Sequence, residues 1–185
     1  MNLTAVDRPQ MDMFGTIVAG RSLRATAPQA IDRSTIEALL DAAVRTPAEI
    51  REEAWAFVVV QNSKVLKHLS DITGFTEGML RHGMTSPPAN LFHDVGTLVV
   101  ICAEPLEPRT WAGCRLAAEN LMVAACAIGL GSCVLNSAVA PLNTPEAKAR
   151  LGIPAGFDVV APVALTLPSK DAAAKRKPLI LHWLQ

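Results

Sequence analysis

Tyrosine is absent from this chain of 185 residues, and aromatic side chains make up only 4% of it. Without tyrosine, any active site lacks one of the common general acids. An excess of positive charge is absent too, because 17 basic residues balance 17 acidic ones. Nucleic-acid binding usually demands a basic face, so we expect no nucleic-acid partner.

Long hydrophobic runs are also missing. The most apolar stretch, residues 116–135, contains Glu119 and Asn120 as well as glycines, and no segment reaches the roughly 18 apolar residues that a membrane span needs. Residues 1–9 lack the basic start and apolar core of a secretory signal. We therefore expect no membrane partner and a cytoplasmic location.

Recognisable metal and redox patterns are absent as well. Cys102, Cys114, Cys126 and Cys133 lie in apolar segments, and their spacings fit neither a zinc site nor a Cys-x-x-Cys pair. We predict buried, reduced thiols, since a cysteine outside a disulfide behaves as a small hydrophobic residue. The four histidines are scattered singly along the chain, so no metal site is predicted.

The remaining composition favours a globular protein of mixed α and β structure. Half of the chain is apolar, which is enough for one buried core, so residues 1–185 are expected to form a single domain. Hydrophobic periodicity predicts helices at residues 11–18, 36–44, 64–72, 115–128 and 144–151. β-Branched and aromatic runs predict strands at residues 55–60, 98–103, 132–135 and 159–167.

Three features of these elements bear on function. Residues 73–93 contain three glycines and two prolines, which is typical of a mobile or cofactor-covering segment. Trp55 opens a strand and is expected to anchor the core. In the apolar helix 115–128, two roles stay open: Asn120 could satisfy a buried backbone group, or Glu119 could pair across a dimer contact.

Cationic groups gather near both ends of the chain. Arg21 and Arg24 flank Ser22 in a predicted loop, and residues 175–177 form a second basic cluster. Two guanidiniums beside a hydroxyl suit a doubly charged phosphate, so the two clusters together predict a phosphorylated cofactor. The alternative is that the arginines are solvated charges near a helix end and that the second cluster is a solvated tail.

Five segments, in this order, resemble the FMN-dependent nitroreductase family: Arg21 to Arg24, Arg45-Thr46-Pro47, Trp55 to Val60, Glu119-Asn120-Leu121 and Gly129 to Ser132. The resemblance covers nearly the whole chain. It implies an α+β sandwich with a mixed β-sheet flanked by helices, an obligate homodimer, and FMN bound in the crevices between subunits. It also implies that hydride passes from NAD(P)H to the flavin and then to an acceptor, without a catalytic protein residue.

The resemblance implies a cofactor site made of Arg21, Ser22, Arg24, Arg51, Asn136, Ser137, Lys175 and Lys177. The two terminal clusters would hold the phosphate and the ribityl hydroxyls. Residues 136 and 137 lie where the family passes backbone amides near the flavin N5. Arg51 stands where the family has an asparagine, so it would face the flavin edge as a donor only.

The function that the resemblance implies is an FMN-dependent NAD(P)H oxidoreductase that reduces small electron-poor acceptors such as nitroaromatics or quinones. A second hypothesis is a degenerate member with weak or no FMN binding that acts as a binding or regulatory dimer. Gly20, Arg51 and Glu53, which replace the family's usual cofactor residues, motivate it. A third hypothesis keeps FMN but uses it to dehydrogenate or fragment a bound substrate.

Overall fold

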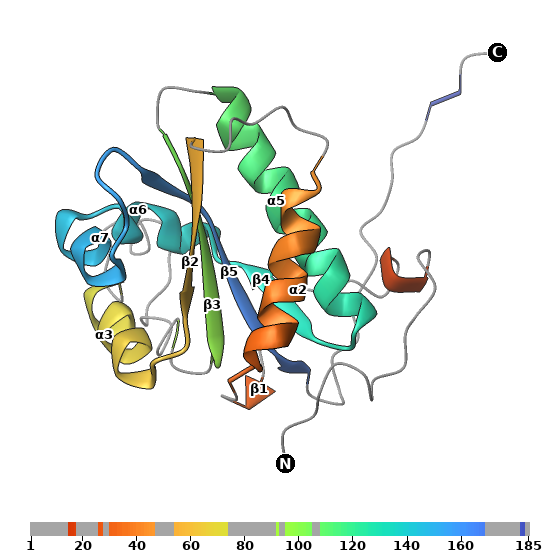
Figure 1. The fold of residues 1–185 in the computed structure, drawn as a ribbon, viewed down its shortest axis with the longest axis horizontal. Helices are drawn as coiled ribbons and strands as arrows, with labels where there is room; N and C mark the ends of the chain where they lie inside the picture. The colour runs from red at the N-terminus through yellow and green to blue at the C-terminus, as the bar shows by residue number, and fades with distance from the viewer. Residues whose placement is uncertain are drawn as a thin grey trace.

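The computed structural model describes residues 15–17, 26–27, 30–46, 54–73, 92, 95–104, 108–168 and 182–183. Its strands are β1 (Thr26–Ala27), β2 (Trp55–Val60), β3 (Thr97–Ala103), β4 (Gly131–Val134) and β5 (Asp158–Pro168). Its helices are α2 (Arg33–Val44), α3 (Ser63–Thr73), α5 (Pro108–Ala127), α6 (Val139–Leu142) and α7 (Pro145–Leu151), with a 3₁₀ turn η3 (Asn136–Ala138) before α6. Figure 1 shows a sheet with helices on both of its faces, which confirms the α+β class.

The strands lie in the order β1-β5-β3-β2, and β4 also pairs with β5. A mixed sheet was expected from the family resemblance, whereas all the strand pairings within the described ranges are antiparallel. For the pair of β2 and β3, the register shows why: Val60, the last residue of β2, lies opposite Leu98 near the start of β3. The chain re-enters the sheet at the end where it left, and this makes the pair antiparallel.

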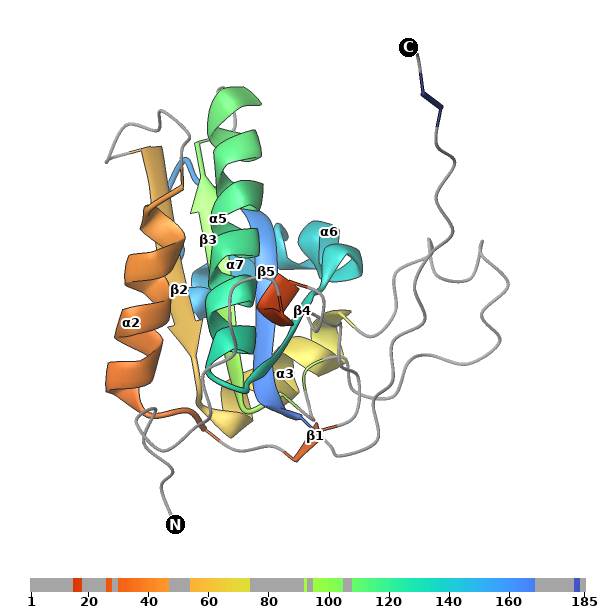
Figure 2. The same cartoon turned by 90° about the vertical axis from the view of Figure 1, so that its right-hand side faces the viewer.

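The middle strand β3 divides the core into two layers. All seven of its residues are buried, and alternate side chains point to opposite faces, as a pleated strand requires. Val99 and Ile101 pack with residues of α2 and α5 on one face. Leu98 and Val100 pack with residues of α3, α6 and α7 on the other face, and Figure 2 shows α2 and α5 together on their side of the sheet.

Local signals explain where the helices begin and end. Asp32 caps α2, because its carboxylate accepts a hydrogen bond of 2.8 Å from the Thr35 N–H. Gly129, with φ 74°, follows the end of α5, where the sequence predicted a stop. This helix begins at Pro108, seven residues before the predicted start, because proline is well suited to the first turn of a helix.

The structure confirms two predicted structural roles. The Asn120 side chain donates to the Ala42 carbonyl at 3.5 Å, so it satisfies a backbone group of α2. Trp55 is half-buried against the α2–α5 layer and makes an edge contact with Phe57 at 5.2 Å between ring centroids. Glu119 is exposed, and its pairing across a dimer contact stays a prediction.

The cysteine prediction is confirmed in part. All four cysteines are outside disulfides, but only Cys102 and Cys114 are buried, whereas Cys126 and Cys133 are half-buried. Burial raises the pKa of Cys102 to about 12 and that of Cys114 to about 11. Because the thiolate is the reactive form, these two residues are inert at neutral pH.

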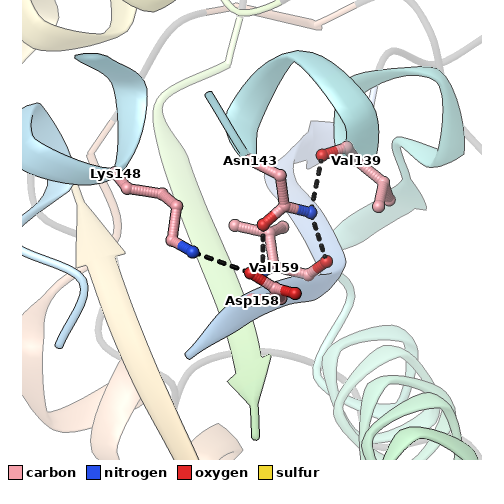
Figure 3. A network of polar contacts seen from close by, with 5 residues as sticks. All are labelled: Val139, Asn143, Lys148, Asp158 and Val159. Atoms are coloured by element: carbon pink, nitrogen blue, oxygen red, sulfur yellow. Dashed lines mark hydrogen bonds and ion pairs between the residues drawn. The ribbon is translucent and has the colours of Figure 1, made fainter. Parts of the chain in front are cut away.

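A side-chain network fixes the start of β5 (Figure 3). The register between β3 and β5 shifts after Ile101, which leaves Val160 as an extra residue. Asn143 accepts from the Val159 N–H at 2.7 Å and donates to the Val159 carbonyl at 3.0 Å. The same amide group donates to the Val139 carbonyl, and Lys148 donates to the Asp158 carboxylate at 2.7 Å. The α6–α7 layer therefore holds β5 in place through hydrogen bonds as well as apolar contacts.

Within the described ranges, no helix has both the length and the apolar character needed to cross a bilayer.

Candidate functional site

Two distant parts of the chain meet where β1 pairs with β5. Thr26 lies opposite Pro168, and Ala27 lies opposite Leu167. Thr26 follows Arg24 by two residues, and Pro168 precedes Lys175 by seven. The antiparallel pair thus joins the segment after the first basic cluster to the segment before the second one.

Six of the predicted site residues lie outside the described part of the chain. They are Arg21, Ser22, Arg24, Arg51, Lys175 and Lys177. The segment expected to cover the cofactor, 73–93, also lies almost wholly outside it, apart from Thr73 at the end of α3 and the buried Phe92. Asn136 and Ser137 are the two predicted site residues that the structure describes.

Asn136 and Ser137 follow β4 at the point where the chain passes from one core layer to the other. Val134 packs against the α2–α5 layer, Leu135 packs against the opposite layer, and Ala138 is buried there. The Leu135 N–H donates to the Pro162 carbonyl at 2.8 Å, which ties this passage to β5. Asn136 and Ser137 themselves are exposed. Both residues are therefore available to a ligand at the edge of the sheet.

The backbone here offers donors as well. The N–H groups of Asn136 and Ser137 have no acceptor among the residues that the structure describes. With the Asn136 amide and the Ser137 hydroxyl, these groups form a compact set of hydrogen-bond donors. Such a set suits a ligand edge rich in carbonyl oxygens and ring nitrogens.

Arg115 adds a charge that sequence reasoning missed. It lies on α5, and its Nη1 donates to Oδ1 of Asn136 at 3.2 Å. The residues are 21 positions apart, and an arginine on an exposed helix face is by itself an ordinary solvated charge. No sequence signal connects it to Asn136, because the contact depends on how α5 packs beside β4.

The described residues show no protein group prepared for nucleophilic or metal chemistry. Cys102 and Cys114 are inert for the reason given above, and no three histidine, cysteine or acidic side chains in the described ranges gather in a possible metal site. What the arrangement can do is bind and orient a ligand through hydrogen bonds and one positive charge.

Comparison with known proteins identifies the family of this chain. The model of the nitroreductase family matches residues 17–165, which is most of the chain. The chain belongs to the nitroreductase family. This membership fits the α+β sheet with a helical layer on each face.

Two solved nitroreductases are similar to this chain in fold and differ from it at most positions of the sequence. A nitroreductase from Bacteroides fragilis, solved with bound FMN, is 27% identical, with a TM-score of 0.77 over 92% of this chain and 95% of that one. A nitroreductase from Desulfitobacterium hafniense, also solved with bound FMN, has a TM-score of 0.76 over 95% of this chain and all of that one. At 18% identity, the second similarity supports the fold alone.

A curated relative comes from Archaeoglobus fulgidus. This provisionally named NADH dehydrogenase/NAD(P)H nitroreductase is 28% identical over 160 residues, which cover 84% of each chain. The chain is thus similar over most of its length to this archaeal protein as well as to the two bacterial nitroreductases.

Proposed function

We propose that the chain binds FMN and uses it to transfer hydride from NAD(P)H to small electron-poor acceptors such as nitroaromatics or quinones. Family membership supports the reaction class. The FMN-bound relative from B. fragilis supports the cofactor, and the name of the A. fulgidus relative supports the reductant.

The pairing of β1 with β5 is the observation that carries the proposal. Because it brings the chain after Arg24 beside the chain before Lys175, it favours a common site for the two basic clusters. In that site Arg21, Ser22 and Arg24 would bind the phosphate from one side. Lys175 and Lys177 would bind it from the other side. Charge-assisted hydrogen bonds of this kind suit a phosphate dianion.

The residues after β4 fit the other end of the cofactor. The exposed Asn136 amide, the Ser137 hydroxyl and their backbone N–H groups match the hydrogen-bonding edge of a flavin. Arg51 would add a donor to that edge. When bound, FMN supplies the two-electron redox chemistry, while the protein binds the rings, orients them and limits access of water.

The proposal includes a homodimer in the cytoplasm with one FMN site at each subunit contact. A mass in solution of twice that of the chain, measured by light scattering, would agree with it. A monomer that still binds FMN would contradict the shared site, because a cleft between two copies cannot exist in one.

The central experiment is an absorption spectrum. The purified chain is mixed with FMN, the excess is removed by gel filtration, and flavin bands are expected to stay with the protein. The double variant Arg21→Ala/Arg24→Ala should bind FMN at least about tenfold more weakly, because it loses two charge-assisted contacts.

A matched control removes two arginines elsewhere. Arg33 begins α2 and Arg45 directly follows it. Both form exposed ion pairs, with Glu37 and Asp41, so the variant Arg33→Ala/Arg45→Ala should retain FMN. A colourless wild-type protein would contradict FMN binding and favour the degenerate, non-flavin member. Equal affinity of the two double variants would contradict the phosphate site.

A further inference from the structure

Arg115 carries a positive charge with no acidic partner among the described residues. Its side chain is exposed, and its hydrogen bond to Asn136 joins it to a neutral amide. None of the ion pairs in the described ranges includes Arg115. The charge therefore stays available to an anion at the edge of the sheet.

Arg115 differs from Arg33 in the group that its guanidinium contacts. Arg33 pairs with Glu37, four positions later, at 2.7 Å. Arg115 has Glu119 at the same spacing, yet its guanidinium turns to Asn136 instead. Helical neighbours at this spacing are able to pair, but in the structure Arg115 contacts Asn136 and not Glu119.

The contact also fixes the Asn136 amide. With Oδ1 accepting from Arg115, the Nδ2 group is turned away as a donor. A guanidinium has five N–H donors in a planar fork, so most of them stay free after this bond. In Figure 2, α5 runs beside β4, with α6 beyond it. The 3.2 Å bond joins a residue of α5 to the residue that begins η3, just after β4.

We propose that Arg115 binds the carboxylate of an anionic acceptor, while its bond to Oδ1 keeps the Asn136 amide oriented for the flavin edge. The site then prefers electron-poor acceptors that carry a carboxylate over neutral ones of the same shape. This inference rests on the proposed function, and it names the substrate class of that site. A planar fork of donors matches the two oxygens of a carboxylate, which makes Arg115 a specificity-determining residue.

The test compares two acceptors of similar shape. The FMN-loaded protein reduces 4-nitrobenzoate, which carries a carboxylate, or 4-nitrobenzamide, which is neutral. The ratio of their kcat/KM values should favour 4-nitrobenzoate and should fall about five- to tenfold in Arg115→Gln, mainly through KM, because one charge-assisted contact is lost. Arg115→Lys should restore part of the ratio, since it keeps the charge but not the planar fork.

Arg150→Gln is the control. Arg150 is exposed on α7, in the layer opposite α5, so the same change of charge there should leave the ratio unaltered. Higher salt should also raise the KM for 4-nitrobenzoate in the wild type and do so less in Arg115→Gln.

Three results would overturn the inference. One is an unchanged ratio in Arg115→Gln although its flavin absorbance equals that of the wild type. Another is a variant Arg115→Gln in which the KM for NADPH rises but the KM for 4-nitrobenzoate does not, which would show that the guanidinium binds the reductant. The third is a wild-type protein without flavin bands after reconstitution, which would overturn both the proposed function and this inference. The absorption spectrum distinguishes this result from the two kinetic results, in which FMN is bound.

Discussion

The Asn143 side chain pairs with Val159 as the backbone of a neighbouring strand would. Its carbonyl oxygen accepts from the Val159 N–H, and its amide donates to the Val159 carbonyl. Both backbone groups of a residue next to the bulge are thereby satisfied. Since β5 in turn pairs with β1 and β4, this contact supports the strand that joins the two parts of the candidate site.

Replacing Asn143 should destabilise the fold strongly. Asn143→Ala removes three hydrogen bonds and leaves the N–H and carbonyl of the buried Val159 without partners. We expect a loss of about 2–4 kcal/mol in the free energy of unfolding, measured by urea denaturation. Asn62 caps α3 on the surface, so Asn62→Ala should cost only about 1 kcal/mol. Equal losses in the two variants would contradict a special role of Asn143.

Removing the Asp32 cap of α2 should lower the free energy of unfolding by an amount that depends on pH. Hydrogen bonds from Ser34 and Thr35 lower the pKa of Asp32 from 3.8 to about 2. A lowered folded-state pKa means that the stabilisation is present above about pH 4 and is lost as the pH falls toward 2. Asp32→Ala should therefore cost about 1 kcal/mol at pH 7 and nearly nothing at pH 2.

Asp32→Asn is the control for that experiment, because asparagine also caps helices well. It should be close to the wild type at pH 7. Below pH 4 its stability should fall less than that of the wild type, since it has no carboxylate to protonate there. Urea titrations across this range would measure both effects. If the unfolding free energies of Asp32→Ala and the wild type still differ as much at pH 2 as at pH 7, the charge of the carboxylate is not the cause of the stabilisation.

The cysteines should differ in reactivity. Cys102 and Cys114 are buried, with a pKa raised to about 12 and about 11, so neither should react with a disulfide reagent in the native protein at pH 7. The half-buried Cys126 and Cys133 should account for all native-state labelling, and Cys126→Ser/Cys133→Ser should abolish it. Guanidinium chloride should expose the remaining two thiols. Native labelling of the double variant, located by mass spectrometry, would contradict the prediction.

A glycine substitution should isolate a backbone effect. Gly152 ends α7 with φ +65°, and an added Cβ would meet nothing within 4 Å. Gly152→Ala should therefore destabilise by about 1 kcal/mol through conformation alone. Gly152→Asn should cost less, since asparagine adopts this conformation more readily. Equal unfolding free energies for the alanine and asparagine variants would contradict this explanation.

Much of the fold could be predicted from the sequence because short-range patterns determine it. Strand β2 matches its prediction residue for residue, since Trp55 to Val60 is a β-branched and aromatic run with polar residues after it. The first turns of α5 were missed, because proline, glycine and polar residues there hide the helical period. Strand β1 has two residues, which is too short for any period to be visible.

The candidate site could be predicted only in part. Asn136 and Ser137 were predicted through the order of family motifs, not through a local pattern, and their role in the site stays a prediction. The contacts made by Arg115 and Asn143 join residues 21 and 16 positions apart, and they depend on the packing of α5 and on the bulge in β5. Hydrophobic periodicity contains no information on such contacts, since it reports which face of an element is buried and not what lies opposite it.

The place of β5 in the sheet sets an order for biosynthesis. This strand is hydrogen bonded to β1, β3 and β4, although residues 158–168 follow all three of these strands in the sequence. Strands β2 and β3 can pair with each other before β5 is synthesised, whereas the pairings of β1 and β4 described here need β5. A nascent chain that stalls before residue 158 would therefore expose unpaired strand edges. Such edges promote aggregation, and chaperones would be expected to bind this chain.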